Sequence, residues 1–184
     1  MACRPSSARG LATLPELETA RLTLRRLTLD DAQFIVRLLN DADFMKHIGD
    51  RGVRTAADVP QYLQLGPFAM YERHGFGLWH VARKPDGAPI GMCGLLKRDT
   101  LPDVDLGYAY LPEYRGQGYA LEAAQACLRH AAGKYGLRRV IAVVSPGNSA
   151  SIALLEKVGM RFEAMHFMRP GEDEVRLYGR TLAD

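Results

Sequence analysis

The sequence has no apolar run of the roughly 18 residues that a membrane-spanning helix requires. Residues 1–15 carry charge but no apolar segment of the kind found in secretory signals, so we expect a cytoplasmic protein without a membrane partner. Cysteine is also scarce, since only Cys3, Cys93 and Cys127 occur in 184 residues. An odd number without paired spacing argues against a disulfide framework and for a reducing compartment.

A large excess of charge of one sign is missing as well. The chain has 24 Lys and Arg against 21 Asp and Glu, and a formal net charge of +3 is too small to predict a nucleic-acid partner. None of the five histidines has metal-ligand spacing to another or to a cysteine, so we expect no metal. His80 lies in an apolar strand pattern and is interpreted as a structural or pocket-lining residue.

Apolar residues, in contrast, make up 47% of the sequence, which suits one globular domain with a substantial core. We expect a flexible tail over residues 1–17 and a single α/β domain over 18–184. Alternation and short apolar runs predict about seven strands in one mixed central sheet, over 21–27, 76–83, 88–97, 104–111, 139–144, 161–168 and 175–182. Helical spacing and capping patterns predict about four helices, over 28–40, from 55 with a break or kink at Gly66-Pro67, over 118–135 and over 149–158, with a loop over 41–52.

A glycine-bearing turn joins the expected strand 104–111 to the expected helix 118–135. It reads LPEYRGQGYA and contains Arg115, Gly116 and Gly118. The first N–H groups of a helix lack partners and its dipole favours negative charge, so glycines there suit an approaching anion. A P-loop would need a lysine, and a dinucleotide loop would need a third glycine where the sequence has Leu121. From this turn alone, an anion site and a purely geometric tight turn both remain open.

The same turn also resembles a known family pattern. RGQGYA (115–120) fits R-x-x-G-x-A and is similar to the acyl-CoA pyrophosphate loop of the GNAT N-acetyltransferase superfamily. The segments TARLTLR (19–25), FGLWHV (76–81), DLGY (105–108), NSAS (148–151) and KVGM (157–160) resemble its RimJ/RimL-like branch, which is similar to ribosomal-protein-alanine N-acetyltransferases. The resemblance runs from about residue 18 to 181.

The resemblance implies the GNAT fold, in which two central strands splay to form the acetyl-CoA cleft. It also implies transfer of an acetyl group from acetyl-CoA to a primary amine by direct attack in a ternary complex. The CoA pyrophosphate would bind backbone N–H groups of the loop formed by Arg115, Gly116, Gln117, Gly118, Tyr119 and Ala120. Tyr110 and Leu111 would pair with the pantetheine arm, and Asn148 would lie beside that arm.

The reaction needs a base, because an amine is mostly protonated at neutral pH. Asp105 is the candidate, acting through water, at a position where many GNAT enzymes carry a strand glutamate; the alternative is a polar strand-end residue. Glu113 is a weaker candidate, and Glu122 is expected to interact with the helix start. The thioester is already activated, so no enzyme nucleophile is required, and no Gly-x-Ser-x-Gly motif occurs. The N–H group of Tyr110 is the candidate donor to the thioester oxygen.

The leaving thiolate needs a proton or a hydrogen bond. Many GNAT enzymes supply it from a tyrosine seven residues after the asparagine, where this sequence has Leu155. The branch resemblance assigns the role to Ser151 instead; the alternative is that Ser151 only satisfies backbone groups at the helix start.

The acceptor is the least determined part of the sequence interpretation. Two regions expected to shape its pocket carry acids, namely Asp41, Asp43 and Asp50 in the first and Glu172, Asp173 and Glu174 in the second. A cationic amine, either a small molecule or a protein N-terminus, would suit such acids electrostatically. The alternative, which composition favours, is ordinary solvated loop charge. We expect a monomer or homodimer. The alternative function is a catalytically weak acyl-CoA-binding sensor or regulatory module.

Overall fold

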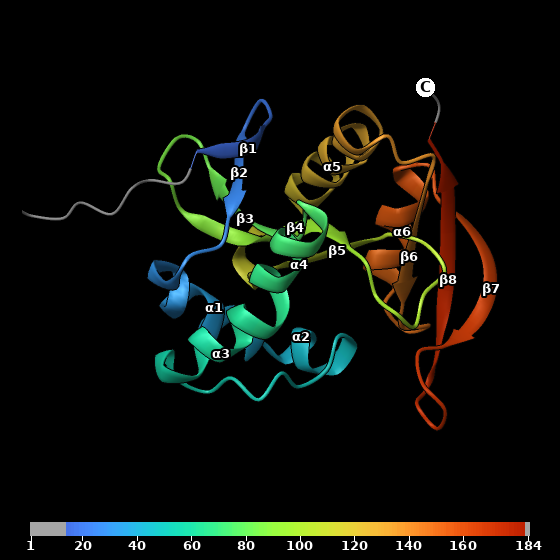
Figure 1. The fold of residues 1–184 in the computed structure, drawn as a ribbon, viewed down its shortest axis with the longest axis horizontal. Coiled ribbons are helices and arrows are strands. Elements are labelled where there is room, and N and C mark those ends of the chain that lie inside the picture. The colour runs from blue at the N-terminus through green and yellow to red at the C-terminus, as the bar shows by residue number, and fades with distance from the viewer. Residues whose placement is uncertain (1–13, 183–184) are drawn as a thin grey trace, which may run out of the picture.

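Two apolar clusters cover opposite faces of one eight-stranded mixed sheet in the computed structural model, which describes residues 14–182. The strands are β1 (Pro15–Glu18), β2 (Leu22–Arg26), β3 (Leu78–Arg83), β4 (Pro89–Leu96), β5 (Asp105–Tyr110), β6 (Arg139–Val144), β7 (Arg161–Phe167) and β8 (Glu174–Thr181). The helices, labelled with the strands in Figure 1, are α1 (Ala32–Leu39), α2 (Ala42–His47), α3 (Val59–Leu63), α4 (Ala69–His74), α5 (Tyr119–Tyr135) and α6 (Ser149–Lys157). Within residues 14–182, no helix has the length and apolar character of a membrane span.

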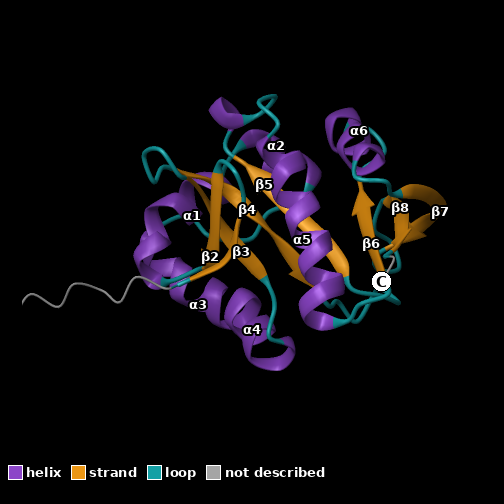
Figure 2. Cartoon of the chain, turned by 90° about the horizontal axis from the view of Figure 1, so that it is seen from above, coloured by secondary structure: helices purple, strands orange, loops and turns teal. Residues whose placement is uncertain are grey.

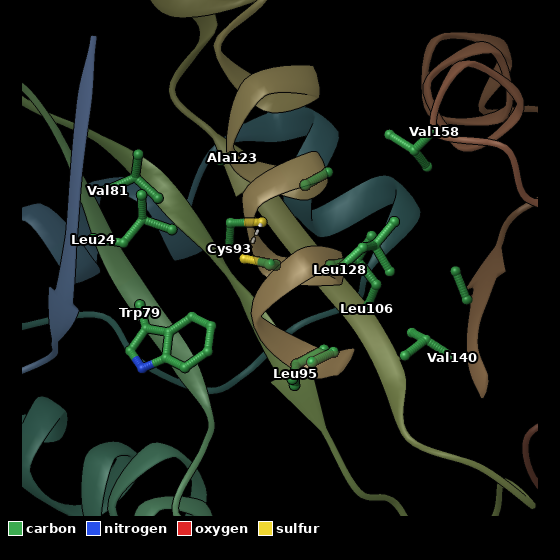
Figure 3. Close-up of a cluster of buried hydrophobic side chains, with 14 of the residues drawn as sticks. Leu24, Trp79, Val81, Cys93, Leu95, Leu106, Ala123, Leu128, Val140 and Val158 are labelled. Carbon is green, nitrogen blue, oxygen red and sulfur yellow. Dashed lines mark hydrogen bonds between the residues drawn. The ribbon is translucent and has the colours of Figure 1, made fainter. Parts of the chain in front are cut away.

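The two faces of the sheet bury different sets of side chains, and Figure 3 shows part of the set that includes Trp79 and Cys93. Trp79 and Cys93 belong to the cluster beneath α5, whereas Phe34 and Met92 belong to the cluster beneath α1 and α3. Trp79 is fully buried, and its strand neighbour His80, which is 4% exposed, packs edge-on against Phe34. Trp79 and His80 therefore point to opposite faces of the sheet, as successive residues of a strand do.

The strand order β1-β2-β3-β4-β5-β6-β8-β7 contains one parallel neighbour pair, β5 and β6. That pair has a single register position, Asp105 opposite Ile141, where the Ile141 N–H donates to the Val104 carbonyl at 3.0 Å. Beyond it the strands separate, and β6 continues in full antiparallel register with β8 (Figure 2). The α/β fold class with splayed central strands is therefore confirmed.

The expected tail boundary at residue 17 is wrong for Pro15–Leu17, because these residues form part of β1. Leu17 lies opposite Leu24 and Glu18 opposite Thr23 at the edge of the sheet. The short segment PELE gives little alternation to detect, and its proline suits an edge strand, where one N–H can be missing. The rest of the expected tail, residues 1–13 with Cys3, lies outside the described residues.

The expected loop over 41–52 is partly wrong, because α2 forms within it. The Asp41 carboxylate accepts a hydrogen bond from the Phe44 N–H at 3.2 Å and so caps a helix of six residues. A helix this short is too brief to give a periodic signal. The capping boxes that begin at Thr28 and Thr55 are confirmed.

The expected disturbance at Gly66-Pro67 takes the form of a wide helical turn. Residues Gln64–Phe68 form a π-helical turn between α3 and α4, with Pro67 inside it. Proline removes an N–H donor and crowds the preceding turn, and the wider turn accommodates both effects without ending the helical path.

Candidate active site

The edge of β5 that faces β6 is open toward its carboxyl end. The Leu111 N–H donates to the Ile90 carbonyl at 2.9 Å, on the β4 side. Because successive residues of a strand direct their N–H groups to opposite edges, those of Tyr110 and Tyr108 point toward the opening. The Leu111 carbonyl accepts from the Tyr114 N–H at 3.0 Å, so both backbone groups of Leu111 already have a partner within the chain.

The loop after β5 leads into α5 with its N–H groups free. Gly116 and Gly118 have φ values of 71° and 81°, in the left-handed region that glycine enters without strain. None of the N–H groups of residues 116–121 has a hydrogen-bond acceptor in the part of the chain that the structure describes. A Cβ atom at Gly116 would meet nothing within 4 Å. The loop therefore has the space and the donors to fit a bound phosphate group.

The side chain of Arg115 is bound by groups outside the glycine turn. Its Nε donates to the Tyr110 carbonyl at 2.9 Å, and its two terminal nitrogens pair with Asp41 and Asp43 on α2 and its cap. Burial acts to raise the pKa of Asp41, but the hydrogen bonds from Arg115 and the Phe44 N–H hold that pKa below its ordinary value. Arg115 thus joins the loop to the helix that borders the expected acceptor side.

Arg21 is one cation beside the loop, and the sequence analysis did not identify it. Its Nη1 donates to the Gln117 carbonyl at 3.1 Å, and its guanidinium lies 4.5 Å from the centre of the Tyr119 ring. Glu122 anchors it, accepting from Arg21 Nε at 2.6 Å and from Thr19 Oγ1 at 2.5 Å. Glu122 therefore ties the start of α5 to the chain before β2, and the only sequence signal was the TARLTLR segment.

Asp105 lies at the closed end of the opening. It is fully buried and paired with Arg98, with Nε–Oδ1 and Nη2–Oδ2 distances of 3.1 and 2.5 Å. Burial raises its pKa above the ordinary range although the Arg98 guanidinium acts to lower it. Alternation puts Asp105 on the same sheet face as Ala109, which packs against the cluster beneath α1 and α3. An extended strand places it about 17 Å from Tyr110, so any proton transfer between these positions needs a water relay.

Asn148 and Ser151 meet the opening from α6. Asn148 caps the helix, since its Oδ1 accepts from the Ser151 N–H at 3.1 Å. The Ser151 hydroxyl is thereby free of any capping role and lies 2.6 Å from the hydroxyl of Tyr108 on β5. Leu155, at the position of the common tyrosine, is buried with 1% exposure. Tyr108 was missed because its contact spans 43 residues and has no local signal.

Comparison with known proteins decides the family. The family model described as acetyltransferase (GNAT) domain matches residues 21–161. The chain belongs to the GNAT acetyltransferase family.

Individual GNAT relatives agree with this assignment. YnaD of Bacillus subtilis, described as an uncharacterized N-acetyltransferase, is 29% identical over 147 residues, which cover 80% of this chain and 83% of YnaD. A GNAT-family acetyltransferase from Bacillus anthracis superposes with a TM-score of 0.74 at 25% identity, covering 89% of this chain and 96% of that one. The fold also matches RimL, a ribosomal L7/L12 alpha-N-protein acetyltransferase solved with coenzyme A, with a TM-score of 0.75 at 17% identity over 89% of this chain and 96% of RimL.

The acids around the GNAT opening are mostly paired with arginine. Besides Asp41 and Asp43, Asp50 is held by Arg54, whose hydrogen bonds lower the pKa of that carboxyl to about 2. Glu113 pairs with Arg37 at 2.6 Å on the surface, in the turn that follows β5. In the second region, Glu172 lies 3.7 Å from Arg169. Paired acids attract a cationic acceptor less than free ones do, so the electrostatic argument for such an acceptor is weaker than the sequence suggested.

A histidine, an aspartate and two cysteines lie buried in the core of the GNAT domain. Nε2 of His80 is 3.8 Å from Asp31, which Arg25 also binds, and burial lowers the His80 pKa to about 4. Cys93 and Cys127 are free and buried, with sulfur atoms 3.6 Å apart (Figure 3). Across residues 14–182, no His, Cys, Asp and Glu side chains gather in a group that could hold a metal ion.

Proposed function

We propose that this GNAT protein is an acetyl-CoA-dependent N-acetyltransferase that acts on a primary amine by direct attack in a ternary complex. The observation that carries the donor assignment is the run of free N–H groups over 116–121, directly beside the open edge of β5. A pyrophosphate suits such a helix start, and an extended arm suits an unpaired strand edge. RimL, a fold neighbour, was solved with coenzyme A, which supports the same donor here.

The geometry of the loop and of β5 supports a set of groups that would hold the donor. The N–H groups of Gly116, Gln117, Gly118, Tyr119 and Ala120 would bind the pyrophosphate, with the Arg21 guanidinium adjacent. The arm would lie along β5, where Tyr110 offers its N–H while its carbonyl is already held by Arg115. Asn148 would border the arm with its side-chain amide, since its Oδ1 is engaged in the helix cap.

The chemistry assigns three roles to residues of this chain. Acetyl-CoA supplies an activated thioester carbonyl. The Tyr110 N–H donates to that carbonyl oxygen, which stabilises negative charge as the amine attacks. Asp105 takes the amine proton through water, and its raised pKa makes it a stronger base than an ordinary aspartate. Ser151 donates a hydrogen bond to the leaving sulfur.

The proposed acceptor is a primary amine of one of two classes. The resemblance to the RimJ/RimL-like branch supports a protein N-terminal amine, and a small-molecule amine fits the same chemistry. The decisive experiment is thiol release from acetyl-CoA in the presence of N-terminal peptides, polyamines and aminoglycosides. We expect at least one class to accelerate release strongly over the amine-free rate.

A second function has specific support, namely a catalytically weak acyl-CoA sensor. Asp105 is neutralised by Arg98, and Leu155 replaces the common acid. Tight binding of acetyl-CoA by calorimetry, with no acceleration by any amine of the panel, would favour the sensor. Absence of acetyl-CoA binding would overturn both functions.

A further inference from the structure

A tyrosine on β5 and a serine on α6 form a hydrogen bond across the opening between β5 and β6. Tyr108 comes from β5, two residues before Tyr110, and Ser151 from the first turn of α6, the helix that follows β6 (Figure 2). Their hydroxyl oxygens are 2.6 Å apart. The contact therefore joins the two parts of the sheet on the side where the strands have separated.

The hydrogen bonds around Ser151 determine how its hydroxyl can point. Its N–H is held by the Asn148 side chain, which fixes the backbone of Ser151 in the first turn of α6. The Tyr108 hydroxyl lies 3.3 Å from the Ser151 carbonyl and 2.6 Å from Oγ, so Oγ is the nearer acceptor for its proton. Burial raises the pKa of Tyr108, which keeps the phenol protonated and able to donate at every working pH.

We propose that Tyr108 is a positioning residue that donates to Ser151 Oγ and so leaves the serine proton directed at the leaving sulfur. The inference rests on the proposed acetyl transfer. As the nitrogen–carbon bond forms, the carbon–sulfur bond breaks with its electron pair going to sulfur, and the base takes the amine proton. The thiolate leaves hydrogen-bonded to Ser151 and takes its proton from solvent. A phenol from β5 thus supports the step for which Leu155 on α6 offers no polar group.

The test compares Tyr108→Phe, Ser151→Ala and the double variant by steady-state acetyl transfer. Tyr108→Phe keeps the ring and removes one hydroxyl, so we expect kcat to fall roughly 10-fold, the equivalent of one hydrogen bond. The KM for acetyl-CoA should stay within about twofold, because the phenol acts on the leaving group and not on donor binding. The double variant should be no slower than Ser151→Ala, since Tyr108 works only through that hydroxyl. Tyr135→Phe is the matched control, because its hydroxyl binds the Gly75 carbonyl far from the opening, and its kcat should be unchanged.

Three results overturn the inference. A Tyr108→Phe loss that multiplies with the Ser151→Ala loss shows independent action, and a rise in KM with unchanged kcat shows a packing role. Full activity in both single variants shows that neither hydroxyl contributes to the reaction. A wild-type protein that turns over no amine overturns the proposed function together with this inference, whereas turnover with independent losses overturns only the inference.

Discussion

Arg115 Nε lies 2.9 Å from the carbonyl oxygen of Tyr110, so one side chain secures the last residue of β5 from within the following loop. The same guanidinium reaches Asp41 and Asp43, which belong to α2 and its cap. The proposed donor site and the border of the acceptor side are therefore fixed by a single residue. A planar guanidinium with its fork of donors can make these contacts together, and a lysine ammonium cannot.

Arg115→Lys should weaken acetyl-CoA binding about 10-fold, because the loop and the Tyr110 backbone lose their common support. Calorimetric titration gives the affinity. Arg37→Lys is the matched control, since it alters an exposed pair with Glu113 beside the same loop. Equal affinities for the two variants would show that the Arg115 contacts do not organise the donor site.

Gly116→Asp should weaken acetyl-CoA binding far more than Gly116→Asn. Both residues tolerate the left-handed conformation at φ 71°, and nothing lies within 4 Å of the new Cβ, so the pair differs chiefly in charge. A carboxylate beside a pyrophosphate is repelled, so we expect at least a 10-fold gap in Kd at low salt that narrows as salt is added. An identical Kd for the two folded variants contradicts a phosphate at this loop.

Arg98→Met should move the acidic limb of the kcat/KM profile to higher pH. Burial already raises the pKa of Asp105, and the guanidinium acts to lower it, so losing Arg98 raises that pKa further. A base works above its pKa, and activity is therefore lost earlier as pH falls.

Asp105→Asn should reduce kcat at all pH values while leaving acetyl-CoA affinity nearly unchanged. Asp103→Asn is the control, because that carboxylate pairs with Arg139 at 3.0 Å and is partly exposed. Full activity of Asp105→Asn across the pH range would exclude Asp105 as the base.

His80 should make the fold sensitive to mild acid. Its folded pKa of about 4 lies below the ordinary 6.5, so the unfolded chain binds the proton more readily. Stability should be complete above pH 6.5 and fall by about 3 kcal/mol as pH drops to 4. Urea unfolding at a series of pH values gives the free energy of unfolding. His80→Gln should reduce its fall between pH 6.5 and 4, whereas His74→Gln, at an exposed position, should leave that fall unchanged. A persistent slope in His80→Gln would assign the acid sensitivity elsewhere.

The parts of the fold that sequence predicted are those with long local signals. The helix now seen as Tyr119–Tyr135 combines an apolar stripe with a terminal Gly136 in the left-handed conformation, and β6 is a continuous apolar run. The sequence analysis did not predict β1 and α2, because segments of four and six residues are too short to show a periodic pattern of apolar residues. Their formation depends on neighbours in space.

In the candidate site, too, the sequence predicted the local features and missed the contacts between distant segments. The glycine loop is a local arrangement, so its free N–H groups followed from its spacing. The direction of the Arg115 side chain depends on Asp41 and Asp43, which are 74 and 72 residues away, and the Tyr108–Ser151 contact depends on the packing of α6. The residue types alone predict neither the direction of the Arg115 side chain nor the Tyr108–Ser151 contact, because both depend on how distant segments pack in the folded chain.

Because β5 and β6 pair at a single register position, most N–H groups on that edge of β5 are open to exchange with solvent. The Ala109 and Leu111 N–H groups face β4 and are locked in its ladder, whereas those of Tyr108 and Tyr110 face the side where no strand pairs. Deuterium should therefore enter β5 at alternate residues, so that neighbouring amides of one short strand differ in protection. An extended ligand arm seated on that edge acts as the missing strand, and it should erase the alternation at Tyr110.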